Sequence, residues 1–257
     1  IALTMEKWNL HRRIALWIIR GVGGGANRII LGFMLAGAFL SMWISNTATA
    51  IMMIPIGLAM VVRMEEDFGE ETTHTFSVGI MLAIAYSCSI GGIATLVGTP
   101  PNLSLQRIFL ITFPDAPPIG FGLWFVMALP ITMILLVIAW LLITRVFYPV
   151  PDRVTVDRSV VEDEAEKLGS PRYEERVVLA VFVSTALLWL FRVPLEIGSI
   201  TVPGWSELLP YGELLDDATI AICMASVLFL VPTRSPGAES ATIMGPDVIG
   251  RLPWNIV

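Results

Sequence analysis

Charged residues are scarce in this sequence. Only 15% of its 257 residues are Asp, Glu, Lys or Arg, whereas soluble domains carry about a quarter. Hydrophobic residues make up 55%, and the mean hydropathy is +0.76, so the composition predicts an integral membrane protein. A basic excess is also lacking, because the formal net charge is −6. A chain without surplus Lys and Arg cannot neutralise many phosphates, so we expect no nucleic-acid partner.

Cysteine and histidine are too few for a disulfide framework or a zinc site. Cys88 and Cys223 lie in separate apolar runs, and the two histidines are not spaced with them as metal ligands. The GxSxG, HExxH and phosphate-loop signatures of enzymes do not occur. The glycine-rich GVGGGANR at 21–28 does not sit between a strand and a helix, so it predicts a hinge and no dinucleotide site. We therefore expect a protein that is not an enzyme.

Five windows of the sequence contain no charged residue. They cover 29–62 (34 residues), 75–106 (32), 116–144 (29), 177–191 (15) and 218–233 (16). A membrane-spanning helix needs about 20 predominantly apolar residues. The third window therefore predicts one transmembrane helix over 117–148. The last two windows reach spanning length only with their flanks, and we predict transmembrane helices over 176–192 and 213–232.

The first two windows carry polar and helix-breaking residues at their centres. SMWISNTATAIMMIPIG interrupts the first, and GGIATLVGTPPNL interrupts the second. Thirty-four residues are many for a single crossing at 1.5 Å per residue, so we predict a re-entrant hairpin over 29–62. We predict a broken transmembrane helix over 74–112, because non-helical backbone at membrane depth survives only inside protein or along a cavity. The fold class is thus an all-α integral membrane protein.

The basic residues indicate the orientation. A re-entrant hairpin enters and leaves the membrane on the same face. With such a hairpin, 14 of the 16 Lys and Arg lie on one side of the membrane, in the segments 1–28, 63–73, 145–176 and 232–257. Only Arg107 and Arg192 lie on the opposite side. The positive-inside tendency places these segments in the cytoplasm. We expect a cytoplasmic interfacial helix and glycine-rich hinge over 1–28, a solvated linker without chemistry over 149–175, and a further cytoplasmic segment over 233–257.

The two broken windows concentrate neutral polar groups and contain no Asp, Glu, Lys or Arg. The candidates are Ser41, Ser45, Asn46, Thr47, Thr49, Thr95, Gly98, Thr99 and Asn102. A cation here would be a hard monovalent ion held by hydroxyl and carbonyl oxygens. An anion would be held by N–H groups and positive helix ends. Sodium coupling is favoured over proton coupling, because neither window holds the buried carboxylate that proton-driven carriers use.

Helix packing is the alternative explanation for these residues. Ser, Thr and Gly in membrane helices more often allow close packing than bind ligands, and isolated serines are explained well in that way. Asn46 is explained less well, because a buried amide costs several kcal/mol unless it has a partner. Pro100 and Pro101 break the helix and free the carbonyls just before them, among them that of Gly98.

The chain resembles the divalent anion/sodium symporter family, which carries dicarboxylates, citrate or sulfate. The resemblance rests on MEKWNLHRRIAL, SNTATAIMMIPI, GGIATLVGTPPN, DDATIAICMASVLFLVP and the terminal LPWNIV. It implies two inverted repeats, an elevator-like mechanism and a homodimer in the inner membrane. It also implies a sodium site from Ser41, Ser45, Asn46 and the backbone near Gly98. Substrate contacts are implied for Asn46, Thr47 and Thr99.

The Ser-Asn-Thr signature of this family occurs once here, at 45–47, and LPWNIV is similar to the lead-in of a second hairpin. We therefore expect an internal fragment of a transporter about twice as long. The expected function is sodium-coupled symport of small dianions, with C4-dicarboxylates such as succinate, malate and fumarate preferred. The alternatives are a sodium-independent anion exchanger of the same fold and a membrane enzyme or scaffold. The sequence leaves the choice among dicarboxylate, citrate and sulfate open.

Overall fold

The computed structural model describes residues 1–23, 25–149, 159–197, 200–235 and 240–250. Helices dominate the described residues. The α-helices are α1 (Ala2–Lys7), α2 (Leu10–Val22), α3 (Ala26–Ser41), α4 (Asn46–Phe68), α5 (Glu70–Gly91), α6 (Pro100–Thr112), α7 (Phe121–Leu141), α8 (Ser159–Leu168), α9 (Tyr173–Leu190), α10 (Asp217–Leu230) and α11 (Pro246–Gly250). Short 3-10 turns are η1 (Gly92–Ala94), η3 (Trp205–Leu208) and η4 (Gly212–Leu214), and η2 (Leu142–Phe147) is a π-helix.

The chain divides into two compact units. We call Arg12–Pro118 with Trp124–Gly169 the core unit, and Ile1–His11, Ile119–Leu123 and Ser170–Val257 the terminal unit. The helical class expected from the sequence holds for both. One element departs from it, an antiparallel two-stranded sheet of β1 (Leu195–Ile197) and β2 (Ile200–Val202) in the terminal unit. These six residues include several β-branched side chains, which favour strands, but each run is too short to show a period in the sequence.

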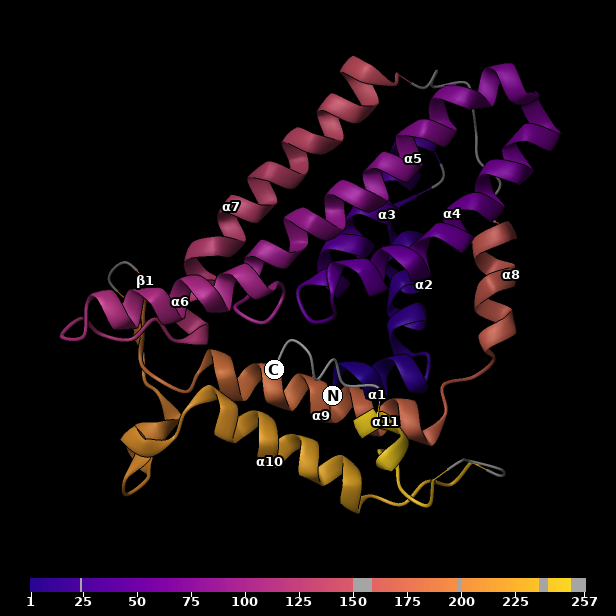
Figure 1. Cartoon of the computed structure of the whole chain (residues 1–257). Coiled ribbons are helices and arrows are strands. Elements are labelled where there is room, and N and C mark those ends of the chain that lie inside the picture. The colour runs from indigo at the N-terminus through magenta and orange to yellow at the C-terminus, as the bar shows by residue number, and fades with distance from the viewer. Residues whose placement is uncertain (24, 150–158, 198–199, 236–239, 251–257) are drawn as a thin grey trace. The chain divides into compact units, whose positions relative to one another are not determined.

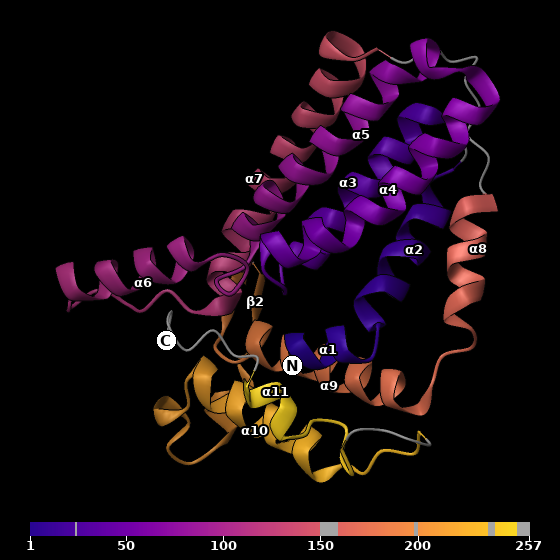
Figure 2. The same ribbon diagram turned by 45° about the vertical axis from the view of Figure 1, so that its right-hand side comes forward.

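Helix α5 is the centre of the core unit and packs against both α3 and α4 (Figures 1 and 2). Glycine allows the close approach to α3: a Cβ at Gly37 would lie 2.5 Å from the hydroxyl of Ser87, and one at Gly91 would collide with the backbone of Ala38. Large side chains fill the remaining space, and Phe33, Met34, Met53, Met60 and Phe76 are fully buried. Such burial contributes about 1.5–3 kcal/mol per side chain in water.

Among the described residues, three helical stretches have the length and composition to cross a membrane. They are Asn46–Phe68, Glu70–Ala94 and Phe121–Phe147. The last corresponds to the single span expected over 117–148, but its final turn is the π-helix η2. The hairpin expected over 29–62 is built as α3, a four-residue turn and α4, and α4 continues six residues beyond Val62. Whether this segment re-enters or crosses the bilayer stays a prediction.

The segment expected as a solvated linker, 149–175, contains helix α8. Its buried residue Val161 belongs to the hydrophobic core of the core unit, which explains why a charged sequence orders as a helix. Residues 150–158 of this segment lie outside the described residues, as do Gly24 of the expected hinge and the LPWNIV motif at 252–257.

The terminal unit contains α9 and α10 side by side (Figure 1). Asp216 caps α10 by accepting from the backbone N–H of Thr219 at 2.7 Å, as the acidic cluster at this position predicts. Asp217 has a different partner, because it pairs with Arg192 at 2.7 Å. This pair holds the end of α9 to the start of α10.

A buried carboxylate joins the other ends of the same two helices. Glu174 is 1% exposed. Its Oε1 accepts hydrogen bonds from the Thr233 hydroxyl at 2.9 Å and from the backbone N–H groups of Arg234 at 2.7 Å and Ser235 at 2.8 Å. The guanidinium of Arg234 also lies 4.1 Å from the centre of the Tyr173 ring. The first turn of α9 therefore fixes the chain just after α10.

Candidate functional site

The first helix break is the turn between α3 and α4. Ser41 ends α3, and its hydroxyl donates a hydrogen bond to the side-chain Oδ1 of Asn46, the first residue of α4. Ser45 is the N-cap, and its hydroxyl accepts from the backbone N–H of Ala48 at 3.2 Å. Ser at this position is a strong helix-start signal. The local sequence therefore explains both the break and the position of the Asn46 amide.

The second helix break separates η1 from α6. Thr99 is the N-cap of α6, and Pro100 and Pro101 occupy its first turn, where the missing proline N–H costs nothing. Asn102 closes the loop, because its Nδ2 donates to the carbonyl oxygens of Gly92 at 2.9 Å and Thr95 at 2.7 Å. Asn102 is buried, so it acts on the loop backbone.

The two breaks are in contact. The hydroxyl of Thr95 in the second break donates to the backbone carbonyl of Met42 in the first. Gly92 lies against Asn46 so closely that a Cβ at Gly92 would be 2.7 Å from the Asn46 Oδ1. A Cβ at Gly98 would in turn lie 2.5 Å from the Gly92 carbonyl oxygen. Gly92 thus connects the Asn46 amide to the backbone at Gly98.

Four helix ends meet at this contact. The C-terminal ends of α3 and of α5 with η1 bring carbonyl groups, and the N-terminal ends of α4 and α6 bring N–H groups. Helix C-termini favour cations and N-termini favour anions. The side chains are neutral, and none of the residues from Ile29 to Val62 or from Thr75 to Gln106 is charged. The arrangement can therefore offer oxygens to a cation and N–H groups to an anion, without a fixed charge of its own.

Helix α4 also carries a buried hydroxyl that is unpaired in the described part of the chain. Thr49 lies one turn along α4 from Asn46, is 1% exposed, and its Oγ1 has no hydrogen-bond partner among the described residues. A buried hydroxyl left unpaired costs about 1–3 kcal/mol. Ser41, Asn46 and Thr49 carry neutral oxygens of the kind that a hard monovalent cation such as sodium prefers.

The structure brings most of the candidate residues together, and Thr47 directly follows Asn46 on α4. Ser41, Asn46 and Gly98 are linked through Gly92, while Ser45 and Thr99 cap the two helices at the same place. Thr47 is exposed in the first turn of α4 and has no side-chain hydrogen bond within the described part of the chain.

Two residues that hold the second helix break in place, Gly92 and Trp124, are not apparent from the sequence. Gly92 is one glycine of a Gly-Gly pair, a weak signal for close backbone approach. Trp124 donates from its indole Nε1 to the carbonyl oxygen of Ile93 at 3.0 Å, so the start of α7 holds the turn η1. This bond joins residues 31 positions apart, and the sequence contains no local sign of it.

The chain is similar to known proteins. The family described as citrate transporter matches residues 1–239. The chain belongs to this transporter family. The family resemblance deduced from the motifs is thereby confirmed, and the chain is part of a multi-pass membrane transporter rather than an enzyme.

Relatives from two staphylococci are similar over the whole chain. The sodium-dependent dicarboxylate transporter SdcS of Staphylococcus saprophyticus is 35% identical over 263 residues, and the protein of the same name from Staphylococcus aureus is 34% identical. Each alignment covers 100% of this chain and 48% of the relative. The chain therefore spans about half the length of these relatives.

Proposed function

We propose that the chain forms half of a sodium-coupled carrier of small dianions, with C4-dicarboxylates such as succinate, malate and fumarate as the preferred substrates. The observation that carries the proposal is the uncharged contact between the two helix breaks, centred on Asn46 and Gly92. Both staphylococcal relatives are named as sodium-dependent dicarboxylate transporters, which supports both the sodium ion and the dicarboxylate.

We assign the sodium ion to Ser41, Ser45, Asn46 and the backbone at Gly98. The two hydroxyls, the amide oxygen and a carbonyl freed before Pro100 are the neutral oxygens that a monovalent cation prefers. We assign the dianion to Asn46, Thr47 and Thr99, where the N-terminal ends of α4 and α6 add favourable dipoles.

Sodium has to bind before or with the dianion in this proposal. A dianion alone would meet only hydroxyls and helix ends, which stabilise a charge by about 0.3–1 kcal/mol each, or about 2 kcal/mol when buried. That is too little to replace the hydration of two negative charges. Bound sodium supplies the compensating charge, so the two affinities must rise together by linkage.

An elevator-like movement of the site is the transport mechanism that we propose. All the assigned residues lie within the core unit, as is required if the domain that holds the site moves as one body. We propose a homodimer on the family resemblance.

Uptake of labelled succinate into vesicles that contain the complete transporter tests this function. Uptake that rises with an inward sodium gradient and disappears in choline supports the proposal. Equal uptake in choline at the same ionic strength would contradict it and would favour the sodium-independent exchanger. A membrane enzyme or scaffold would give no uptake under either condition.

A further inference from the structure

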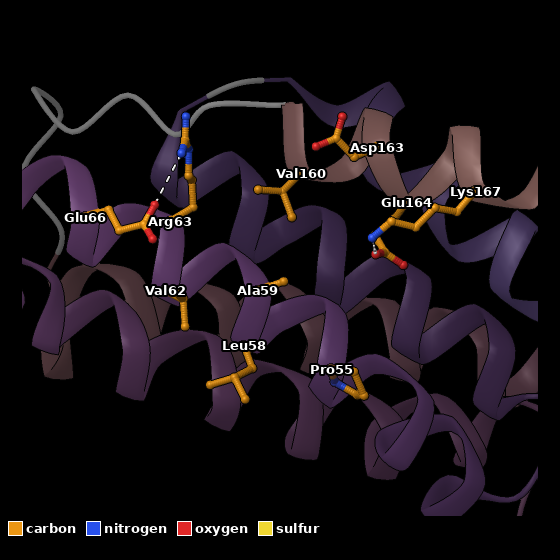
Figure 3. A pocket seen from close by; sticks show the side chains of 10 residues that line it. All are labelled: Pro55, Leu58, Ala59, Val62, Arg63, Glu66, Val160, Asp163, Glu164 and Lys167. Atoms are coloured by element: carbon orange, nitrogen blue, oxygen red, sulfur yellow. Dashed lines mark hydrogen bonds and ion pairs between the residues drawn. The ribbon is translucent and has the colours of Figure 1, made fainter.

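A groove of about 490 Å³ lies between α4 and α8 in the core unit, away from the helix breaks (Figure 3). Its floor is apolar and is made by Pro55, Leu58, Ala59 and Val62 of α4. Leu58 is 51% exposed and Val62 is 47% exposed. The transport site proposed above uses none of these residues.

Helix α8 is held in place beside the groove. Val161 anchors it in the hydrophobic core, and Glu164 forms an ion pair with Arg12 of α2. Arg13 donates to the carbonyl oxygen of Gly169 at 2.9 Å, just after α8 ends. Because α2 fixes α8 at several points, α8 is not free to close onto the apolar floor.

The charged groups on the rim differ in how firmly they are paired. Glu164 is engaged by both Arg12 and Lys167. Arg63 is paired with Glu66 at 3.2 Å, and both side chains are about half exposed, an arrangement worth little energy. Asp163 has no ion-pair partner within the described ranges of the chain. Figure 3 shows Arg63 on α4 and Asp163 on α8, on opposite walls of the groove.

The position of the groove on α4 indicates what lies next to it. Helix α4 has the length and composition of a membrane span, and its uncharged stretch ends at Val62, directly before Arg63. Hydrocarbon gives way to lipid headgroups where the apolar part of a span meets its first charged residues. An apolar floor with a rim of both charge signs at this level complements a zwitterionic lipid.

We propose that this groove binds one phosphatidylethanolamine molecule, with an acyl chain on Leu58 and Val62, the phosphate at Arg63 and the primary ammonium at Asp163. An ammonium group has N–H donors for a carboxylate, whereas the quaternary ammonium of phosphatidylcholine has none. The site therefore discriminates between two lipids of equal net charge. The inference goes beyond the proposed transport function and does not depend on it.

Native mass spectrometry of the complete transporter tests the proposal. The protein is incubated with equal amounts of phosphatidylethanolamine and phosphatidylcholine that carry the same acyl chains. We expect a preference of about two- to fivefold for phosphatidylethanolamine, the range that one exposed charge pair supplies. Asp163→Asn should abolish the preference, and Arg63→Gln should lower retention of both lipids.

Matched variants distinguish lipid binding in the groove from the general effects of changing a surface residue. Glu162→Gln removes an equal charge from the same helix but does not line this groove, so it should keep the preference. Leu58→Trp fills the floor and should lower retention of both lipids, whereas Ile54→Trp, outside the groove, should not.

Three results would overturn the proposal. The first is equal retention of the two lipids by the wild-type protein, and the second is an unchanged preference in Asp163→Asn. The third is retention of neither lipid. In that case a cysteine that replaces Leu58 could be cross-linked to whichever protein segment occupies the groove, and would identify it. The experiment measures lipid retention and not uptake. Failure of the proposed transport function would therefore not change its result.

Discussion

The hydroxyl of Ser41 donates a hydrogen bond to Asn46 Oδ1, and so joins the last residue of α3 to the first residue of α4. The bond leaves the Nδ2 group of the same amide as a donor. Asn46 can therefore present an oxygen on the cation side and N–H groups on the anion side. A carboxylate at this position could not do both, because it has oxygens and no donor.

Asn46→Ala is expected to reduce sodium-driven succinate uptake about ten- to hundredfold. A hydrogen bond to a charged group contributes about 1.5–3 kcal/mol, and 1.4 kcal/mol corresponds to a factor of ten. Initial uptake rates in vesicles measure the effect, and surface labelling checks membrane insertion. Ser89→Ala is the matched control, because this exposed hydroxyl bonds within its own helix, to the carbonyl oxygen of Ala85. Wild-type uptake by Asn46→Ala would refute the site assignment.

Alanine substitutions at the neighbouring residues Gly91 and Gly92 should have different effects, one on folding and the other on transport. A Cβ at Gly92 would meet the movable amide of Asn46, so Gly92→Ala should fold but transport with a raised KM for succinate. A Cβ at Gly91 would meet the rigid backbone of Ala38, so Gly91→Ala should destabilise the protein by about 1–3 kcal/mol or more.

Thermal unfolding in detergent and uptake kinetics, measured in parallel, distinguish the two effects. Gly21→Ala is the control, because nothing lies within 4 Å of its Cβ position. If Gly92→Ala retained the wild-type KM, the contact between Gly92 and Asn46 would have no role in substrate binding.

The helix breaks could be predicted from the sequence because local residues create them. Ser45 is a helix start, Pro100 and Pro101 cannot continue a helix, and the absence of charge over 29–62 and 75–106 predicts that these segments enter the membrane. The family could be recognised from the same motifs.

The contacts that assemble the site could not be predicted in this way. The Thr95 hydroxyl bonds to Met42, 53 positions earlier, and Trp124 bonds to Ile93; neither pair is linked by any periodicity. Helix α8 is likewise not apparent from the sequence, because the charged run VEDEAEK is typical of a solvated segment. Its order depends on tertiary contacts, chiefly the burial of Val161 and the ion pair between Glu164 and Arg12.

The topology of the first window can be tested with single cysteines. Cysteines that replace Arg28 and Arg63 should both react with an impermeant label from the cytoplasm. Helix α3 has 16 residues, about 24 Å, and a hydrocarbon core of about 30 Å is too thick for it to cross. A cysteine at Arg107 should react from the opposite face. Labelling of Arg28 and Arg63 positions from different faces would make this segment a crossing helix.

Glu174→Gln is expected to destabilise the protein in a pH-dependent manner. Burial would raise the pKa of Glu174, but hydrogen bonds from the backbone at Arg234 and from Thr233 and Ser235 outweigh it and lower the pKa from 4.5 to about 2. A carboxyl whose pKa is lower in the folded state stabilises that state above its unfolded pKa, and the stabilisation is lost as the pH falls through the folded pKa. At pH 7 the variant should therefore be less stable by about 1–3 kcal/mol.

The difference in stability between the wild-type protein and Glu174→Gln should then shrink as the pH falls from about 4.5 towards 2, because the wild-type carboxyl becomes protonated and neutral over this range, like the amide that replaces it. Urea unfolding of the complete transporter in detergent at several pH values measures this difference. Glu207→Gln is the control: the side chain is exposed, so its removal should change stability by no more than about 0.5 kcal/mol at any pH. A difference between wild type and Glu174→Gln that stayed constant down to pH ~2.5 would mean that the geometry of the carboxyl, and not its charge, holds residues 233–235 to the start of α9.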